Sequence, residues 1–134
     1  MDNGLKSFQA RFRGIPEQIR ATIGPDLVAA AGEVAAQVRR IAPVDQGDLA
    51  ASVAVTGPGQ ATPAYSQPGG SMVVPSNAAA ITAGNTDVRY AHLVEYGTSK
   101  SAAQPFFWPA FNVTRESAVG KVKAAVRRAV RGQK

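Results

Sequence analysis

Residues 24–43 read GPDLVAAAGEVAAQVRRIAP, and this stretch sets the architecture. Its apolar side chains recur every three or four residues, as on one face of a helix; they are Leu27, Ala31, Val34, Val38 and Ile41. Gly24-Pro25-Asp26 is typical of a helix start, because proline suits the first turn and aspartate complements the helix dipole. Pro43 ends the pattern, since the residue before a proline disfavours helical geometry. The stretch predicts a long amphipathic helix.

A second apolar stripe precedes this helix. Within residues 5–20 it consists of Leu5, Phe8, Phe12, Ile15 and Ile19. Gly14 and Pro16 interrupt it, so we expect a first helix that breaks near Gly14 and a turn that leads on. Residues 5–20 then form an N-terminal arm on a single domain that spans residues 1–134, because a chain of this length holds one core.

The segment after the long helix predicts a turn and then a strand. Residues 43–49, PVDQGDL, contain Gly47, which can take a positive φ. Asp45 and Asp48 can bond nearby backbone N–H groups. Residues 51–56, ASVAVT, alternate in polarity and predict the first strand of a small sheet.

The middle of the chain predicts a long loop between strands. Residues 57–70, GPGQATPAYSQPGG, are uncharged and rich in glycine and proline, so they predict a flexible loop without a packed element. A loop of this length either orders on assembly or stays floppy. Strands can resume at 72–74 and 79–83, and residues 84–87, GNTD, are typical of a hairpin-like turn.

Two further segments complete the pattern. Residues 88–98, VRYAHLVEYGT, predict either a strand or a short helical turn that ends at Gly97. From Pro109 a final helix is expected to run to about Arg131. Its inner stripe is Phe111, Ala118, Val119, Val122, Val126 and Ala129, and its outer face carries Lys121, Lys123, Arg127, Arg128 and Arg131. The order of helix, strands and helix predicts an α+β fold, in which a long helix of the N-terminal half and the basic C-terminal helix pack on a small antiparallel sheet.

Composition excludes several classes of protein. The 134 residues include no cysteine and one histidine, so disulfides and thiolate or multi-histidine metal sites are not expected. Apolar runs are only a few residues long, and the first four residues lack the features of a secretory signal, so we expect no membrane partner. The net charge of +6 is concentrated in residues 101–134, which carry seven basic side chains and one acidic one. A basic end favours an anionic partner, either nucleic acid or an acidic protein face.

No catalytic constellation stands out. Asp45 and Asp48 flank Gly47 and are interpreted as turn-forming rather than as a carboxylate pair. His92 and Glu95 are three residues apart and would face each other on a helix, but a nucleophile is missing beside them. The chain is therefore not expected to be an enzyme or to bind a cofactor or a metal; a site at His92 and Glu95 is the distant alternative.

The basic C-terminal helix allows nucleic-acid binding as an alternative. Aromatic residues for base stacking are not interleaved with its charges, so any contact would be to phosphates and without sequence preference. The same charges are also explained by the solvated face of an amphipathic helix.

Residues 105–109, PFFWP, favour a role in assembly. Three adjacent large aromatic side chains cannot all face one way, so at least one is expected to point outward unless another chain covers it. Aromatic residues are common anchors of protein interfaces.

Two segments resemble a known family of phage proteins. Residues 41–49, IAPVDQGDL, followed by Ala51-Ser52-Val53, resemble its "APVDTG-x-L-x-x-S" segment. Residues 90–98, YAHLVEYGT, with QPFF at 104–107 and Pro109-Ala110, resemble its "YA-x-x-VE-F/Y-GT … P-F-L/F-x-P-A" segment. The family is the gene-product-ten-like group of long-tailed bacteriophages, called tail-completion, minor tail or head–tail joining proteins. The resemblance covers roughly residues 27–130, and it departs from the family pattern at Gln46 and Trp108.

This resemblance implies a structural virion protein with a fold related to tail terminators. Such a protein is expected in the neck of a siphovirus-like particle, assembled in the bacterial cytoplasm as a ring, with six-fold symmetry, between the head connector and the tail tube. A ring requires head-to-tail contacts that close. Its neighbours would be a stopper or connector and a terminator or the tube. The basic helix would face either channel DNA or an acidic neighbouring subunit. The tail terminator and the stopper are alternatives within the same neck, and a small non-specific DNA-binding protein is the alternative from another class.

The resemblance also assigns roles to individual residues. The expected turn-forming residues are Asp45, Gly47, Leu49, Gly97 and Thr98. Together with the aromatic residues Phe106, Phe107 and Trp108, which the run of three adjacent aromatics already places at an interface, Glu95 and Tyr96 form the expected subunit or partner interface. Glu95 is expected to pair with a basic residue, in the chain or on a neighbour.

Overall fold

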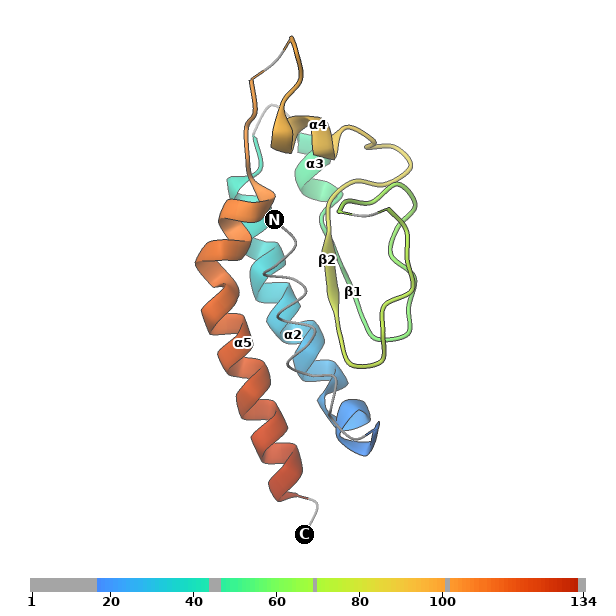
Figure 1. The fold of residues 1–134 in the computed structure, drawn as a ribbon, viewed down its shortest axis with the longest axis vertical. Helices are drawn as coiled ribbons and strands as arrows, with labels where there is room; N and C mark the ends of the chain where they lie inside the picture. The colour runs from blue at the N-terminus through green and yellow to red at the C-terminus, as the bar shows by residue number, and fades with distance from the viewer. Residues whose placement is uncertain (1–16, 44–46, 69, 101, 133–134) are drawn as a thin grey trace.

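Two long antiparallel helices run the length of the molecule, and a small sheet lies beside them (Figure 1). The computed structural model describes residues 17–43, 47–68, 70–100 and 102–132. Its elements in chain order are α2 (Glu17–Ile41), α3 (Gly47–Ala51), β1 (Ala54–Thr56), β2 (Ala80–Thr82), α4 (Ala91–Tyr96) and α5 (Phe107–Arg131). The architecture is α+β, which confirms the fold class predicted from the sequence.

The core lies where α2 meets α5 on one side and the sheet on the other. The apolar stripe of α2 faces this core, and Ile23, Val34 and Val38 are at most 2% exposed. From α5, Phe111, Ala118 and Val122 close the opposite side. The predicted stripe of α5 is thus directed inward, whereas Ile41 at the end of the α2 stripe is 37% exposed and Ala42 is buried in its place.

Helix α2 starts earlier than the sequence predicts. We placed a helix start at residues 24–26, but α2 begins at Glu17 and continues through Pro25. A proline inside a helix removes one backbone hydrogen bond, here to the carbonyl of Ala21. The core contacts of Ile19 and Ile23, both at most 3% exposed, hold the helix together ahead of the proline. Residues 5–16 of the expected arm lie outside the described residues, and 17–20 form the first turn of α2.

The segment after α2 also differs from the prediction. Residues 47–51 form the short helix α3, and the strand starts only at Ala54. The N–H of Ser52 donates to the carbonyl of Asp48 (3.0 Å), which continues the helical pattern beyond α3. Leu49 is fully buried, so one helical turn inserts it into the core, and this contact overrides the strand propensity of the sequence around it.

The described residues form a sheet of two antiparallel strands, with Val55 of β1 opposite Ile81 of β2. The long connection between them, including the predicted loop, contains no regular element among its described residues. Isolated bridges join Ala61 to Val73 and Gln67 to Ala83, so the predicted strand at 72–74 is reduced to a single bridge. A turn forms at residues 85–88, one residue later than predicted, and it leads into α4 rather than joining two strands.

Residues 88–98 were predicted to form either a strand or a short helical turn, and the structure shows a short helix. Helix α4 covers Ala91–Tyr96 and ends at Gly97, whose φ is +78°. Helix α5 begins at Phe107, two residues before the predicted start, and ends at Arg131 as predicted.

Candidate assembly site

The carboxylate of Glu95 caps the N-terminus of α5. The first backbone N–H groups of a helix have no partner inside the helix. Oε1 of Glu95 accepts hydrogen bonds from the N–H groups of Phe106 and Phe107, both at 2.9 Å, and Oε2 accepts one from Trp108 at 3.2 Å. The fourth residue of this turn, Pro109, has no N–H. One side chain from α4 therefore satisfies every donor that the start of α5 presents.

The observed partners of Glu95 differ from the expected one. We expected a basic side chain, whereas the structure surrounds a carboxylate that is only 7% exposed with backbone donors. Charge-assisted hydrogen bonds are stronger than neutral ones, and the positive end of the helix dipole favours an anion. The interaction therefore fixes α4 against α5 without a second charged residue.

The residues after Glu95 turn the chain toward α5. Gly97 donates its N–H to the carbonyl of Leu93 (2.8 Å), and its positive φ favours glycine. The hydroxyl of Thr98 accepts a hydrogen bond from the N–H of Lys100 (3.1 Å). The N–H of Gln104 then returns to the carbonyl of Val94 (2.8 Å). This turn presents the segment 105–109 to the Glu95 carboxylate.

The aromatic segment is divided between core and surface. Phe106 and Phe107 are 1% and 7% exposed, so both belong to the core of the chain. Trp108 is half-buried, makes edge-to-face contacts with Phe107 and Phe111, and donates its indole N–H to the hydroxyl of Tyr96 (2.8 Å). Tyr96 is 54% exposed. Of the five residues expected at an interface, Trp108 and Tyr96 form the outward-facing part.

The first motif builds a second buried polar contact. The hydroxyl of Ser52 donates to the carbonyl of Leu49 (2.6 Å) and accepts the N–H of Gly84 (2.8 Å). Gly84 has a φ of +97°, and a Cβ there would lie 2.9 Å from the carbonyl oxygen of Val88. Ser52 thus connects the α3 segment to the turn that precedes α4. Gly47 is the first residue of α3, and Asp45 lies outside the described residues.

The sequence alone predicts no role for Ser52, and for Gly84 it predicts only a place in a turn. The pairing joins residues 32 positions apart, and periodicity carries no information about such a contact. The available signal is a glycine at the start of a turn.

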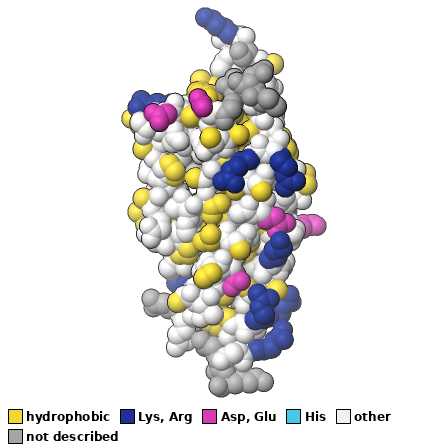
Figure 2. All heavy atoms as spheres, turned by 180° about the vertical axis from the view of Figure 1, so that it is seen from behind, with side chains coloured by type: hydrophobic (Ala, Val, Ile, Leu, Met, Phe, Trp, Pro, Cys, Tyr) yellow, Lys and Arg dark blue, Asp and Glu magenta, His cyan; other side chains and the backbone are white. Residues whose placement is uncertain are grey.

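Basic side chains gather along the side of the molecule that α5 forms (Figure 2). The five predicted residues, Lys121, Lys123, Arg127, Arg128 and Arg131, are all exposed. Lys121 forms an ion pair with Glu33 of α2, and Arg128 approaches Asp26 at 3.7 Å. Hydrogen bonds from Lys121 and then Ser117 lower the pKa of Glu33 below its ordinary value. Part of the basic face therefore ties α5 to α2.

The remaining candidates do not assemble into a reactive site in the described part of the chain. His92 is exposed on α4, and the carboxylate that was to face it is occupied by the start of α5. Within residues 17–43, 47–68, 70–100 and 102–132, no group of three or more potential metal ligands comes together. The helices described there include none with both the length and the hydrophobicity needed to cross a membrane.

Both sequence motifs thus build buried contacts that fix the α+β fold. The family model of the HK97-gp10-like proteins, described as a tail component of the bacteriophage HK97-gp10 type, matches residues 6–97. The chain belongs to this family of phage tail components, and the resemblance drawn from the two motifs is confirmed. Comparisons with curated proteins and with solved structures found no match.

Proposed function

We propose that this protein forms a ring at the head–tail junction, where it joins the head connector to the tail tube and completes the tail. Its family consists of phage tail components, which supports a place in the virion. The observation that carries the proposal is the pair formed by Trp108 and Tyr96, an aromatic surface on α5 and α4 held rigidly by the Glu95 cap. Rigid aromatic side chains are favoured anchors for subunit contacts.

The proposed ring is a homo-oligomer, most simply a hexamer, that contacts the stopper or connector on one side and the terminator or tube on the other. Heterologous contacts close into a ring when one face of a subunit fits a different face of the next. We further propose that the fold is related to that of tail terminators, as the family resemblance implies. The terminator and the stopper remain the alternatives for its level in the neck.

Deletion of the gene from the phage or prophage tests this role. The proposal predicts DNA-filled heads and separate tails in the lysate, and joined particles when the gene is supplied in trans. Complete, infectious particles without the gene would contradict it. Mature tails without heads would favour this joining role, whereas tubes of uncontrolled length would favour a terminator.

A second candidate is non-specific DNA binding by the basic face of α5. The exposed side chains of Lys123, Arg127 and Arg131 favour it, since phosphate contacts need accessible cations. Titration with duplex DNA at two salt concentrations tests it. Tight binding that weakens steeply with salt would support this candidate, and weak binding at low salt would contradict it.

A further inference from the structure

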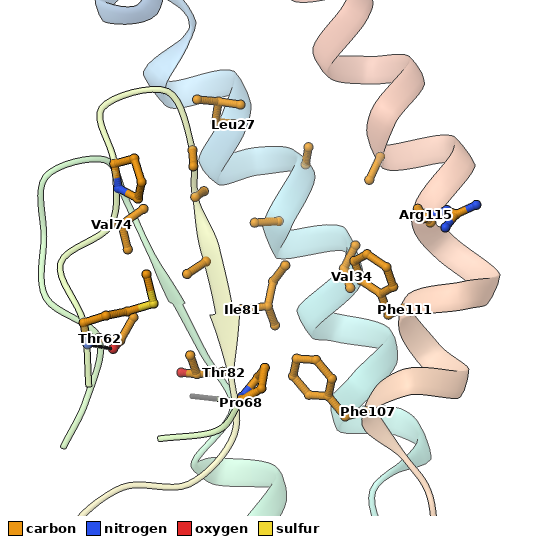
Figure 3. Close-up of a pocket in the computed structure, with 18 of the residues that line it drawn as sticks. Leu27, Val34, Thr62, Pro68, Val74, Ile81, Thr82, Phe107, Phe111 and Arg115 are labelled. Carbon is orange, nitrogen blue, oxygen red and sulfur yellow. Dashed lines mark hydrogen bonds between the residues drawn. The ribbon is translucent and has the colours of Figure 1, made fainter. Parts of the chain in front are cut away.

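An apolar groove opens between the sheet side of the molecule and α5, with α2 as its floor (Figure 3). Side chains from three sides line it, among them Val34 from α2, Ile81 from β2 and Phe111 from α5. The cavity measures about 100 Å³. A cavity of about 150 Å³ is large enough to bind benzene, so this groove accepts a single aliphatic side chain.

The rim of the groove on α5 carries Trp108 and Arg115. Trp108 continues the groove into the aromatic surface that it forms with Tyr96. Arg115 is exposed and turns its guanidinium away from the apolar lining (Figure 3). A partner that brings a carboxylate beside an apolar side chain would therefore complement both the rim and the groove.

The outer face of α5 presents that combination. Val113 is 71% exposed, more than any other large apolar side chain of the described residues. Glu116 is exposed three residues later, on the same side of the helix. Gly120 follows after one more turn, and a Cβ added there would contact no other described part of the chain within 4 Å. This face is therefore open to a neighbouring molecule.

The groove and the outer face lie on different sides of the same helix. Successive residues of an α-helix are turned by about 100°, so Val113 and Arg115 point in directions about 200° apart around α5. One molecule therefore cannot place its own Val113 in its own groove. A ring needs two different, complementary faces of this kind, because its contacts run head to tail.

We propose that the groove of each subunit in the ring receives Val113 of the next subunit, and that Glu116 of that neighbour pairs with Arg115 at the rim. The inference rests on the proposed ring and names the two faces that close it. Among the described residues, neither Arg115 nor Glu116 forms an ion pair, so both charges are available to a neighbour. Opposite charges across an interface fix its register and disfavour wrong partners.

Charge reversal tests the pairing, by complementation of a phage or prophage that lacks the gene. Arg115→Glu or Glu116→Arg alone sets like charges against each other at every interface, so each is expected to lower the number of joined particles several-fold. The double variant restores opposite charges and is expected to recover joining. The control is Arg131→Glu, the same change at the far end of α5, which is expected to join normally. All four chains are expected to keep the wild-type melting temperature, because the replaced side chains are exposed.

Normal joining by both single variants, no recovery in the double variant, or an equal loss with Arg131→Glu would overturn the pairing. Loss with Arg115→Glu but not with Glu116→Arg would also overturn it and would assign the groove to a different neck protein. The proposed function is contradicted by a separate result, which is the formation of complete particles without the gene.

Cysteine pairs give a second measurement that does not depend on charge, since the natural sequence has no cysteine. Met72 lines the groove and is 46% exposed, so Met72→Cys with Val113→Cys places one thiol on each proposed face. Mild oxidation of purified particles is expected to give a ladder of disulfide-linked multimers on a non-reducing gel. The matched control, Met72→Cys with Val130→Cys, uses another exposed residue of α5 and is expected to stay monomeric. Equal crosslinking in the two pairs, or none in the Val113 pair, would contradict the proposal.

Discussion

Replacement of Glu95 by glutamine tests the cap on α5. Glutamine keeps the shape but loses the charge, and its NH₂ group would meet backbone donors where the carboxylate accepts three hydrogen bonds. Hydrogen bonds to charged groups contribute about 1.5–3 kcal/mol each to stability, and buried donors left unpaired add to the loss. We expect Glu95→Gln to lower the free energy of unfolding by about 2–3 kcal/mol in urea denaturation. The matched control is Glu116→Gln on the exposed face of α5, and equal stability of the two variants would contradict the assignment.

Ser52 is the corresponding residue of the first motif. Its hydroxyl links the Leu49 carbonyl to the Gly84 N–H. Ser52→Ala leaves that buried N–H without its partner, which costs about 1–3 kcal/mol. Faster hydrogen exchange of the Gly84 amide, together with a lower melting temperature, is the expected result. Ser99→Ala, on the exposed turn after α4, serves as the control, and an unchanged Gly84 amide would contradict the role of Ser52.

The contact between α2 and α5 is expected to depend on pH through Glu33. Hydrogen bonds from Lys121 and Ser117 lower the pKa of this carboxyl below its ordinary value of 4.5. A lowered pKa in the folded state means that the stabilisation is present above pH 4.5 and is lost as pH falls through the folded-state value. Because Lys121 is 63% exposed, the effect is expected to stay below about 1 kcal/mol and to weaken with salt.

Urea denaturation of the wild type and of Glu33→Gln over a range of pH measures this contribution. The two stabilities are expected to converge in acid, to separate as pH rises from the folded-state pKa of Glu33 toward 4.5, and to differ by a constant amount above pH 4.5. A difference that is constant over the whole pH range would show that the ion pair does not carry the effect.

The elements illustrate how far the sequence alone can lead. Both long helices follow from apolar periodicity, because each buries one face over about seven turns. The predictions at Pro25 and in the α3 segment are wrong for the same reason. Local propensity disfavours a helix at both places, whereas burial of Ile23 and Leu49 in the core stabilises one. The short strands could be located only approximately, since three residues carry too little periodicity.

The contacts of the candidate site are even harder to predict from the sequence than the secondary structure. The family motifs single out Glu95 and Tyr96, and the run of three adjacent aromatic residues singles out Trp108, but the sequence does not predict the direction in which each side chain points. The Glu95 carboxylate lies 11 to 13 positions from the N–H groups it accepts, and no helical or strand period relates residues at that separation. Only the fold identifies the hydrogen-bond partners of Glu95 and of the Trp108 indole.

At the level of the assembled particle, a substitution of Tyr96 distinguishes an effect on assembly from an effect on folding. Tyr96→Ala removes an exposed side chain whose hydroxyl accepts the Trp108 indole N–H, so the chain is expected to keep its fold, with a loss of about 1 kcal/mol or less. Complementation with this variant is expected to yield fewer joined particles, counted by electron microscopy. Val130→Ala on α5 removes a similarly exposed apolar side chain and is expected to support normal yields. Equal yields from both variants would contradict an interface at Tyr96.

The most direct measurement of the central claim is the number of copies of this chain in purified particles, determined by quantitative mass spectrometry against a major tail protein. A closed ring at the head–tail junction predicts about six copies per particle. Copies in the hundreds would identify a tube or shell subunit, and absence from the particle would contradict a structural role and make DNA binding the leading explanation.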